Sequence, residues 1–307
     1  MNKSCLVCLN ECDSPNGYHR DCLKTLFGSA TVPQIELEEG LIQTAALAMA
    51  GRTSLSGVQK KLSVKLSADF RTLQIAAEGG SYILKPRTGT FSRLPEIEHT
   101  TMQLARLAKL EVADNGLIRA MDGQMAYLAK RFDRRTDGSK IHQEDFCQLA
   151  GISPAEKYAG SAELCVRIVR QFATEPGIEM VKLFRQFLFS WWVGNGDLHL
   201  KNLSLLIDSA GVVKLTPAYD LVATRLLIPD DELAMPICGR DRKLTRNTWL
   251  KFADYAAIQR RAALRIISDQ VKQLSNSIEL LQHSYLSESE QVRLSQLLQE
   301  RTAVLNE

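Results

Sequence analysis

The polar residues that follow one apolar segment of this chain are the ones best suited to chemistry. The segment covers residues 183–193, and Asp197, His199, Lys201 and Asn202 come directly after it. So many polar groups beside an apolar helix are costly unless they face a cleft or a ligand. Asp197 and Asn202 are five positions apart, the spacing of a base-like aspartate and a metal-binding asparagine in phosphoryl-transfer loops. We therefore expect this loop to act in phosphoryl transfer.

A second carboxylate stands downstream of that loop. Asp220 comes 18 residues after Asn202 and follows a strand-like run at residues 211–215. An amide and a carboxylate offer oxygen ligands, which suit Mg²⁺ because this ion keeps several waters and takes few protein ligands. Either aspartate alone would be equally well explained as a capping or turn residue. Their combination favours a Mg²⁺ site at Asn202 and Asp220.

Two upstream features could bind phosphates. The loop at residues 54–61 reads SLSGVQKK and can offer backbone N–H groups to anionic oxygens, although an ordinary turn explains it as well in isolation. Lys85 ends a strand-like run, and Glu98 lies near the start of the next predicted helix. A lysine at a strand end is usually solvated, but kinases pair such a lysine with a helix glutamate to grip the nucleotide phosphates.

Four of the seven cysteines lie within the first 22 residues. Two residues separate Cys5 from Cys8, and two separate His19 from Cys22, which are the ligand types and pair spacing of a small zinc knuckle. The loop between the pairs is short, so a metal-free terminus with reactive thiols stays open. Zinc bound by these four residues would be structural, since no coordination position is left for catalysis.

The predicted elements divide the chain into a strand-rich front and a helical back. A helical stretch is expected at residues 41–50, a helix begins at Pro95, and helices dominate from about residue 142. The predicted strands cover residues 63–66, 72–76, 81–85, 117–121 and 124–132. We therefore expect an α+β, two-lobed protein, with residues 1–130 as a β-rich N-lobe and residues 131–307 as a helical C-lobe. The cleft between two such lobes is a natural ligand site.

Composition restricts the class of protein. The 307 residues are 45% hydrophobic and 24% charged, which excludes global disorder and fibrous folds. The net charge of +3 is too small to argue for direct nucleic-acid binding. The N-terminus lacks the apolar run of a signal peptide, and the uncharged run at residues 186–196 is too short to span a bilayer. These features predict a cytoplasmic protein without a membrane partner.

Taken together, the motifs resemble the HipA-like serine/threonine kinases of bacterial toxin–antitoxin systems. The matching stretches run in order from residue 54 to residue 222 and read SLSGVQKKL, YILKPR, EIEHTTMQLAR, AKRFDRR, HQEDFCQLAGI, GNGDLHLKNLSLL and LTPAYDLV. The resemblance implies a two-lobed protein-kinase-like fold. It differs from eukaryotic protein kinases in its glycine-poor phosphate loop and in a Tyr-Asp-Leu sequence where those kinases have Asp-Phe-Gly.

The resemblance implies a role for each matching residue. Asp197 would be the catalytic base, with His199 and Lys201 in the same loop, and Asn202 and Asp220 would bind Mg²⁺. Lys85 would grip the phosphates with Glu98 orienting it, and Lys130, Arg131 and Phe132 would form the hinge beside the adenine. The full set expected to bind ATP is Ser56, Gly57, Val58, Gln59, Lys60, Lys61, Lys85, Glu98, Lys130, Arg131, Phe132 and Tyr219.

The resemblance also implies regulation and partners. A phosphate-loop serine of the family is autophosphorylated, which shuts the enzyme down; Ser54 is the matching position and Ser56 the second candidate. A phosphate adds about −1.5 to −2 charges and would repel ATP. With Ser54 only 53 residues from the start, the chain is similar to the short HipT-type kinases, in which a separate HipS-like small antitoxin supplies a missing N-terminal subdomain. A HipB-like helix-turn-helix protein would mediate any contact with DNA.

The expected function is therefore that of an ATP-dependent kinase toxin. Its expected protein substrate is an aminoacyl-tRNA synthetase, whose phosphorylation would stop translation and growth. Two alternatives stay open: a small-molecule kinase of the aminoglycoside-phosphotransferase type, which shares the Asp-x4-Asn loop, and a regulatory or corepressor subunit bound to a DNA-binding antitoxin. The HQEDF stretch and the loop serines favour the protein kinase.

Overall fold

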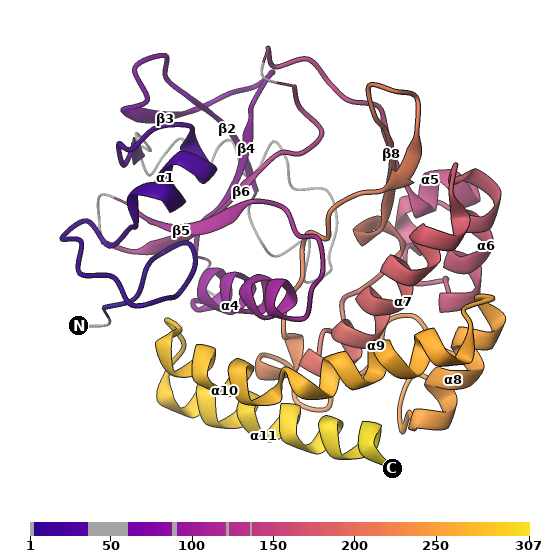
Figure 1. Cartoon of the computed structure of the whole chain (residues 1–307). Coiled ribbons are helices and arrows are strands. Elements are labelled where there is room, and N and C mark those ends of the chain that lie inside the picture. Colours follow the sequence, from indigo (N-terminus) through magenta and orange to yellow (C-terminus); the bar gives the residue numbers. More distant parts are fainter. Residues whose placement is uncertain (1–2, 36–60, 88–90, 121–122, 136) are drawn as a thin grey trace. The chain divides into compact units, whose positions relative to one another are not determined.

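The computed structural model of the chain describes residues 3–35, 61–87, 91–120, 123–135 and 137–307 (Figure 1). The helix expected at residues 41–50 lies outside the described residues. The chain divides into two compact units. Unit 1 comprises Met1–Gln103, Ala113–Lys140 and Leu280–Leu286, and unit 2 comprises Leu104–Val112, Ile141–Glu279 and Ser287–Glu307. A domain boundary after residue 130 stays a prediction.

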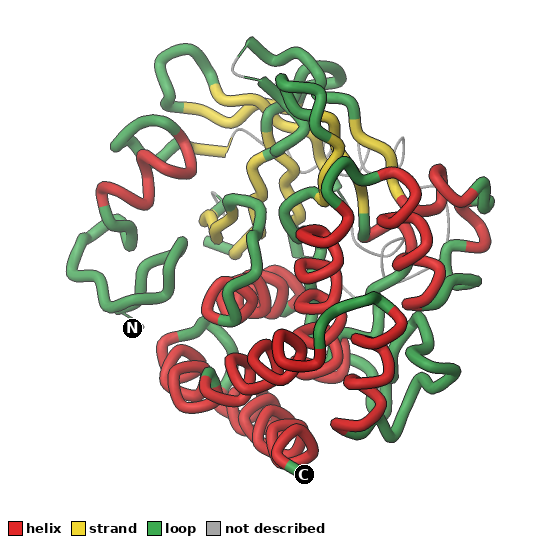
Figure 2. The backbone as a smooth tube through the Cα atoms, turned by 45° about the vertical axis from the view of Figure 1, so that its right-hand side comes forward, coloured by secondary structure: helices red, strands yellow, loops and turns green. Residues whose placement is uncertain are grey.

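Unit 1 is built on a six-stranded sheet, whose strands are among the yellow segments of the tube in Figure 2. Its strands lie in the order β1-β3-β2-β4-β6-β5; β1 is parallel to β3, and the other neighbours are antiparallel. The strands are β1 (Gln34–Ile35), β2 (Leu62–Leu66), β3 (Thr72–Ile75), β4 (Tyr82–Lys85), β5 (Asn115–Arg119) and β6 (Met125–Lys130). The five strands that the sequence predicts for this unit are confirmed to within two residues at each end, because turn signals bound each strand.

Two helices complete unit 1. Helix α1 (Arg20–Phe27) packs its apolar side, Leu23, Leu26 and Phe27, into the core that the sheet forms. Helix α4 (Leu94–Leu107) begins within one residue of the predicted start and crosses the division between the units near its end. Asn115 on β5 holds α4, since its Oδ1 accepts from Gln103 Nε2 at 3.0 Å and lies 3.1 Å from His99 Nδ1. These bonds fix the rotation of the helix that carries Glu98.

Unit 2 is mainly helical, as predicted. Its long helix α7 is buried along most of its length and packs against α6, α9 and α11. Stacked and edge-on aromatic rings join α7 to α8, with Phe184 and Phe252 at a centroid distance of 5.8 Å. The helices are α5 (Phe146–Ala150), α6 (Ala162–Phe172), α7 (Pro176–Val193), α8 (Arg246–Tyr255), α9 (Arg260–Lys272), α10 (Leu274–His283) and α11 (Glu288–Asn306). Helix α10 ends in residues assigned to unit 1.

A small antiparallel sheet of unit 2 is only partly anticipated by the sequence. It has the order β7-β8-β9, with β7 (Gln143–Asp145), β8 (Ser204–Ile207) and β9 (Val213–Leu215). Only β9 is predicted, because β7 (Gln-Glu-Asp) has no apolar residue and β8 (Ser-Leu-Leu-Ile) has an apolar run without alternation. The sheet matters because β7 and β8 flank the candidate catalytic loop. No helix among the described residues is both long and apolar enough to cross a bilayer.

Candidate active site

Lys85 and Glu98 form a buried ion pair in unit 1. Lys85 ends β4, Glu98 lies in the second turn of α4, and Nζ and Oε1 are 2.6 Å apart. The exposed fractions of the two residues are 4% and 0%. The ammonium also lies 5.5 Å from the ring centroid of Tyr127, the neighbour of Lys85 across β6. The sequence-based suspicion that Lys85 is a solvated strand end is wrong, because pairing with Glu98 compensates its burial.

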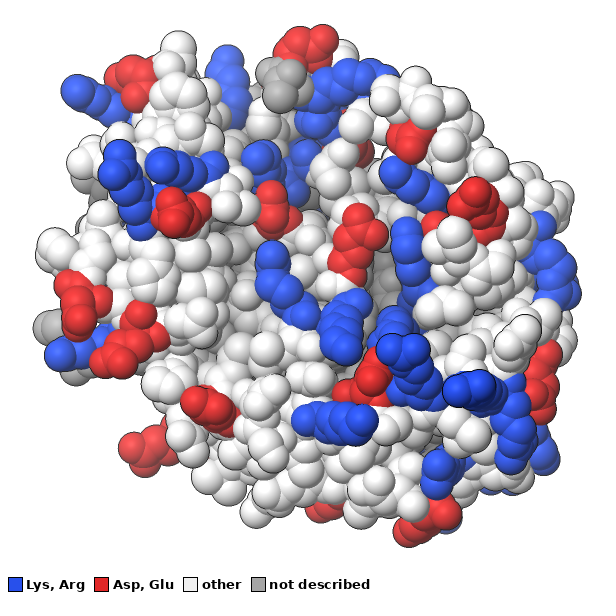
Figure 3. All heavy atoms as spheres, viewed as in Figure 1, with Lys and Arg blue, Asp and Glu red and all other residues white. Residues whose placement is uncertain are grey.

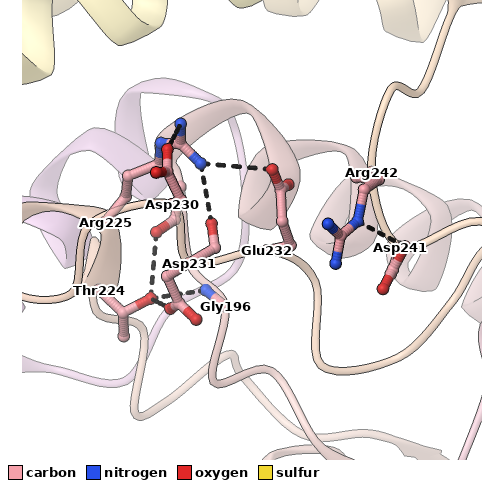
Figure 4. Close-up of polar contacts among 9 residues, drawn as sticks. Gly196, Thr224, Arg225, Asp230, Asp231, Glu232, Asp241 and Arg242 are labelled. Atoms are coloured by element: carbon pink, nitrogen blue, oxygen red, sulfur yellow. Dashed lines mark hydrogen bonds and ion pairs between the residues drawn. The ribbon is translucent and has the colours of Figure 1, made fainter.

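The loop that carries Asp197 begins at the carboxyl end of α7. Gly194 ends the helix in the left-handed conformation with φ of 76°, and the N–H of Asn195 donates to the carbonyl of Ser190 at 2.8 Å. The N–H of Gly196 donates to Thr224 Oγ1 at 2.7 Å, and the Thr224 hydroxyl in turn reaches the carboxylate of Asp231 (Figure 4). A Cβ on Gly196 would lie 2.1 Å from Asp231 Oδ2, so this close approach requires glycine.

Hydrogen bonds within the loop then position Asp197. Its N–H donates to Asn195 Oδ1 at 3.1 Å, and its carbonyl accepts from Asn202 Nδ2 at 3.0 Å. The carboxylate accepts from the Tyr158 hydroxyl at 2.5 Å and lies 4.0 Å from His199 Nε2. Because the loop uses the amide nitrogen of Asn202, its Oδ1 is the atom of that side chain suited to a cation.

The neighbouring polar residues are held in place by unit 2 itself. Lys201 Nζ pairs with Asp145 Oδ2 at 2.6 Å, and Asp145 also caps α5 in a capping box with Gln148. The Tyr219 hydroxyl donates to the carbonyl of Lys201 at 2.9 Å. Asp220, next to Tyr219, has φ of 58°. A non-glycine residue in this left-handed region costs about 1 kcal/mol, and such strain concentrates at functional sites.

The predicted hinge residues have partners of their own within unit 1. The Arg131 N–H donates to the carbonyl of Ser81 at 2.8 Å, and its guanidinium pairs with Asp133 at 2.7 Å. Burial would raise the pKa of Asp133, but the hydrogen bond from Arg131 and the charges of Arg131 and Arg134 outweigh it and hold that pKa below its usual value. Lys130 Nζ donates to the carbonyl of Thr25 at 3.3 Å, and Phe132 is partly buried. Contact of these residues with adenine stays a prediction.

Most of the predicted phosphate loop lies outside the described residues. Ser54, Ser56, Gly57, Val58, Gln59 and Lys60 lie outside the described residues, and only Lys61 of the loop, directly before β2, is described. Lys85 and Glu98 belong to unit 1, whereas Asp197, His199, Lys201, Asn202, Tyr219 and Asp220 belong to unit 2. Each unit therefore gathers its own share of the predicted residues.

The cysteine and histidine residues of the N-terminus come together in unit 1. The ligand atoms of Cys5, Cys8, His19 and Cys22 all lie within 4.8 Å of one another. Hydrogen bonds from the thiols of Cys22 and Cys8 hold the pKa of Cys5 well below its ordinary value. Cys12 has its own contact, an N–H donated to the carbonyl of Lys3 at 2.6 Å. The predicted grouping of the four residues is confirmed.

Comparison with known proteins identifies the family. The family described as "HipA-like C-terminal domain" matches residues 53–278. The chain belongs to this HipA-like family. Two proteins of Sinorhizobium fredii, "Putative kinase Y4mE" and "Putative kinase Y4dM", are 32% and 33% identical over 74% and 72% of the chain. These alignments cover 56% of each relative, so the HipA-like chain spans little more than half their length.

Solved structures support the predicted fold. HipA of Shewanella oneidensis, solved in a complex with HipB and operator DNA, matches with a TM-score of 0.67 and 22% identity over 83% of this chain and 65% of its own. The Helicobacter pylori proinflammatory kinase CtkA matches with a TM-score of 0.55 and 15% identity over 73% of this chain and 88% of its own. The α+β, kinase-like fold predicted for this HipA-like chain is thus confirmed.

Sequence reasoning assigned no role to several residues that contact the catalytic loop. Tyr158 bonds to Asp197, Thr224 and Asp231 hold Gly196, and Asp145 pairs with Lys201. Asp145 lies inside the HQEDF stretch, so the sequence pointed to this segment, but only the fold shows that Asp145 pairs with Lys201. Tyr158 stands 39 positions before its partner, and no local spacing could have indicated it.

Proposed function

We propose that this chain is an ATP-dependent serine/threonine-protein kinase. The observation that carries the proposal is the buried Lys85–Glu98 ion pair, at 2.6 Å between β4 and α4. A buried ion pair seldom improves stability over apolar residues of similar volume, so its retention favours a functional role. The same strand-and-helix pair holds the phosphate-binding lysine in protein kinases.

The proposed reaction gives each candidate residue of the site a role. Asp197 accepts the proton of the substrate hydroxyl, whose oxygen bonds to the γ-phosphorus as the bond to the bridging oxygen of ADP breaks. Asn202 and Asp220 offer the oxygen atoms that fit Mg²⁺, which would neutralise charge on the phosphates when bound. Lys85 binds the α- and β-phosphates, while His199 and Lys201 shape the loop.

Regulation of the kinase is proposed from the family resemblance. Autophosphorylation of Ser54, or of Ser56, would place about −1.5 to −2 charges in the loop that receives ATP and so stop the reaction. The protein target would be an aminoacyl-tRNA synthetase in the cytoplasm, and its modification would arrest growth. One curated relative, 26% identical over 61% of this chain, carries the name "Serine/threonine-protein kinase toxin HipA" in Shewanella oneidensis.

Two protein partners are proposed for the toxin role. The fold relative from Shewanella oneidensis was solved with HipB and operator DNA, which supports a HipB-like DNA-binding partner. A HipS-like small antitoxin is proposed from the HipT-type resemblance alone. The face seen in Figure 3 carries both basic and acidic side chains, and the net charge of the chain is only +3, so we propose that any DNA contact runs through the partner.

Phosphoryl transfer to the chain itself tests the proposal. The purified protein is incubated with Mg²⁺ and γ-labelled ATP, and labelled peptides are mapped; we expect label on Ser54 or Ser56. Asp197→Asn should reduce labelling on the order of 10³-fold or more, because it removes the base. Asp254→Asn, an exposed aspartate on α8, is the matched control and should label normally.

Four results would count against parts of this assignment. A wild-type protein that neither binds ATP nor becomes labelled overturns the kinase and favours the regulatory subunit. Normal labelling of the Asp197→Asn variant removes Asp197 from the mechanism. Growth arrest by expressed Asp197→Asn as strong as by wild type separates toxicity from phosphoryl transfer, and transfer to aminoglycosides but to no protein supports the small-molecule kinase.

A further inference from the structure

We propose that Cys5, Cys8, His19 and Cys22 bind one zinc ion that fastens the N-terminal segment to the edge of the unit 1 sheet. The four residues come from the loop before α1 and from the first turn of α1. Three sulfur atoms and one imidazole nitrogen are a donor set typical of structural zinc. The site is separate from the residues proposed for phosphoryl transfer.

The distances fit tetrahedral coordination. With Zn–S near 2.3 Å and Zn–N near 2.0–2.1 Å, a tetrahedron places a sulfur and a nitrogen ligand about 3.6 Å apart. His19 Nδ1 lies 3.4 Å from Cys8 Sγ and 3.9 Å from Cys22 Sγ. All four ligand atoms lie within 4.8 Å of one another, so small adjustments suffice to surround one ion.

The surroundings prepare the ligands for a metal. His19 Nε2 lies 2.9 Å from the backbone carbonyl oxygen of Glu11. Because a carbonyl oxygen can only accept a hydrogen bond, Nε2 carries the proton and Nδ1 presents its lone pair to the sulfur atoms. The backbone N–H groups of Val7 and His19 both donate to Cys5 Sγ at 3.5 Å. Such donors stabilise a thiolate, the form in which cysteine binds zinc.

The position of the cluster indicates what the ion would stabilise. Strand β5 is an edge of the sheet, and the loop covers it: the N–H of Leu117 donates to the carbonyl of Leu6 at 2.7 Å, and the Tyr18 hydroxyl donates to the carbonyl of Leu117 at 2.8 Å. A Cβ on Gly116 would lie 3.0 Å from Val7, so the loop packs closely on the strand. The ion would keep the loop packed on the strand and would supply stability that a larger hydrophobic core supplies in other proteins.

The cover also reaches the strand that carries Lys85. Helix α1 follows His19, and the carbonyl of Leu26 accepts from the Tyr82 hydroxyl at 2.9 Å. Tyr82 lies at the start of β4, three residues before Lys85. Loss of the ion should therefore loosen α1 and lower the thermal stability of the protein, while the catalytic loop of unit 2 keeps its own hydrogen bonds.

Metal analysis of the full chain tests the proposal. Protein purified without chelators should contain one zinc per chain, and Co²⁺ exchanged into it should give the absorption bands of tetrahedral sulfur coordination. Removing the ion from the wild-type protein with a chelator should lower Tm by about 5 °C or more, and Zn²⁺ but not Mg²⁺ should restore it.

Variants separate the ligands from the other cysteines. Cys8→Ser and Cys22→Ser should lose on the order of tenfold or more in zinc affinity. Cys12→Ser, in the same loop, and the exposed Cys238→Ser are matched controls that should keep zinc. If the ligand variants fail to fold, the chelator experiment on the wild type still decides. Protein that takes up neither Zn²⁺ nor Co²⁺, a disulfide within the cluster, or a Tm unaffected by the chelator would overturn the proposal.

Discussion

Lys85 in unit 1 and Asp197 in unit 2 are both buried or nearly so, yet they are held in different ways. Lys85 pairs with a carboxylate of opposite charge, Glu98, at 2.6 Å. The backbone of Asp197 is held by Asn195 and Asn202, with Thr224 fixing the preceding glycine, and its carboxylate accepts from the Tyr158 hydroxyl. A position held by charge loses its support when the charge is removed, whereas a position held by backbone bonds keeps its shape when the side chain changes.

The contrast predicts different results for substitution in the two units. Removing one member of a buried ion pair leaves the other charged and without compensation, which costs about 3–5 kcal/mol. Changing the carboxylate of Asp197 to an amide leaves the bonds of its N–H and carbonyl intact. Substitution of Lys85 or Glu98 should therefore lower the stability of the protein, while substitution of candidate residues in either unit should lower its activity.

The largest effect is expected for the ion pair. Glu98→Gln should lower the free energy of unfolding by about 3 kcal/mol or more and reduce phosphoryl transfer on the order of a hundredfold or more, because Lys85 loses its partner. Urea unfolding and the ATP labelling assay measure the two quantities. Glu78→Gln, an exposed glutamate of unit 1, is the control and should change neither.

The double variant Lys85→Met with Glu98→Leu separates the contribution of the ion pair to stability from its contribution to activity. It removes both charges, so stability should recover toward that of the wild type while phosphoryl transfer stays lost. Recovery of both would show that the pair serves stability alone. A Glu98→Gln variant as stable as wild type would contradict the view that Lys85 is held by charge.

A smaller effect is expected at the support of the catalytic loop. Thr224→Val removes the hydroxyl that accepts the N–H of Gly196 and should cost about 1 kcal/mol of stability and on the order of tenfold in phosphoryl transfer. Thr174→Val is the matched control, since Thr174 Oγ1 accepts the N–H of Val213 at 2.9 Å outside the loop. Equal activity of the two variants would show that Thr224 contributes stability without positioning Asp197.

The sequence predicted the elements that have their own local signals. Turn signals bound the strands β2 to β6, and α4 begins one residue before a proline that is followed by helical spacing, so each was found from its own residues. Helix α1 was missed because its eight residues cover little more than two turns. Strand β7 has no apolar residue, and the apolar run of β8 does not alternate, so neither shows the period of a strand. Helix α1 has no side-chain cap at His19, and its position depends on the loop around it.

The candidate site shows the same limit. Spacing indicated Asp197, Asn202 and Asp220 as candidates because the residues of a catalytic loop lie close together in sequence. The contacts that hold them come from distant segments, such as Tyr158 and Thr224, and only packing brings these together. The N-terminal cluster was found because all its ligands fall within 18 consecutive residues.

The smallest effect extends the comparison to a partly exposed pair in unit 1. Asp133 bonds to Arg131 and Arg134, and these partners hold its pKa below the ordinary value against the effect of burial. A lowered folded-state pKa gives stability that is present above the unfolded pKa of about 3.9 and is lost as the pH falls through the folded value.

Asp133→Asn should therefore lower the free energy of unfolding by about 1 kcal/mol at pH 7, and the difference from wild type should shrink below about pH 4. Urea unfolding from pH 7 to pH 3, with Glu78→Gln as control, measures this. A difference that does not change with pH would mean that Asp133 acts through packing, and charge would then matter in unit 1 only where the pair is fully buried.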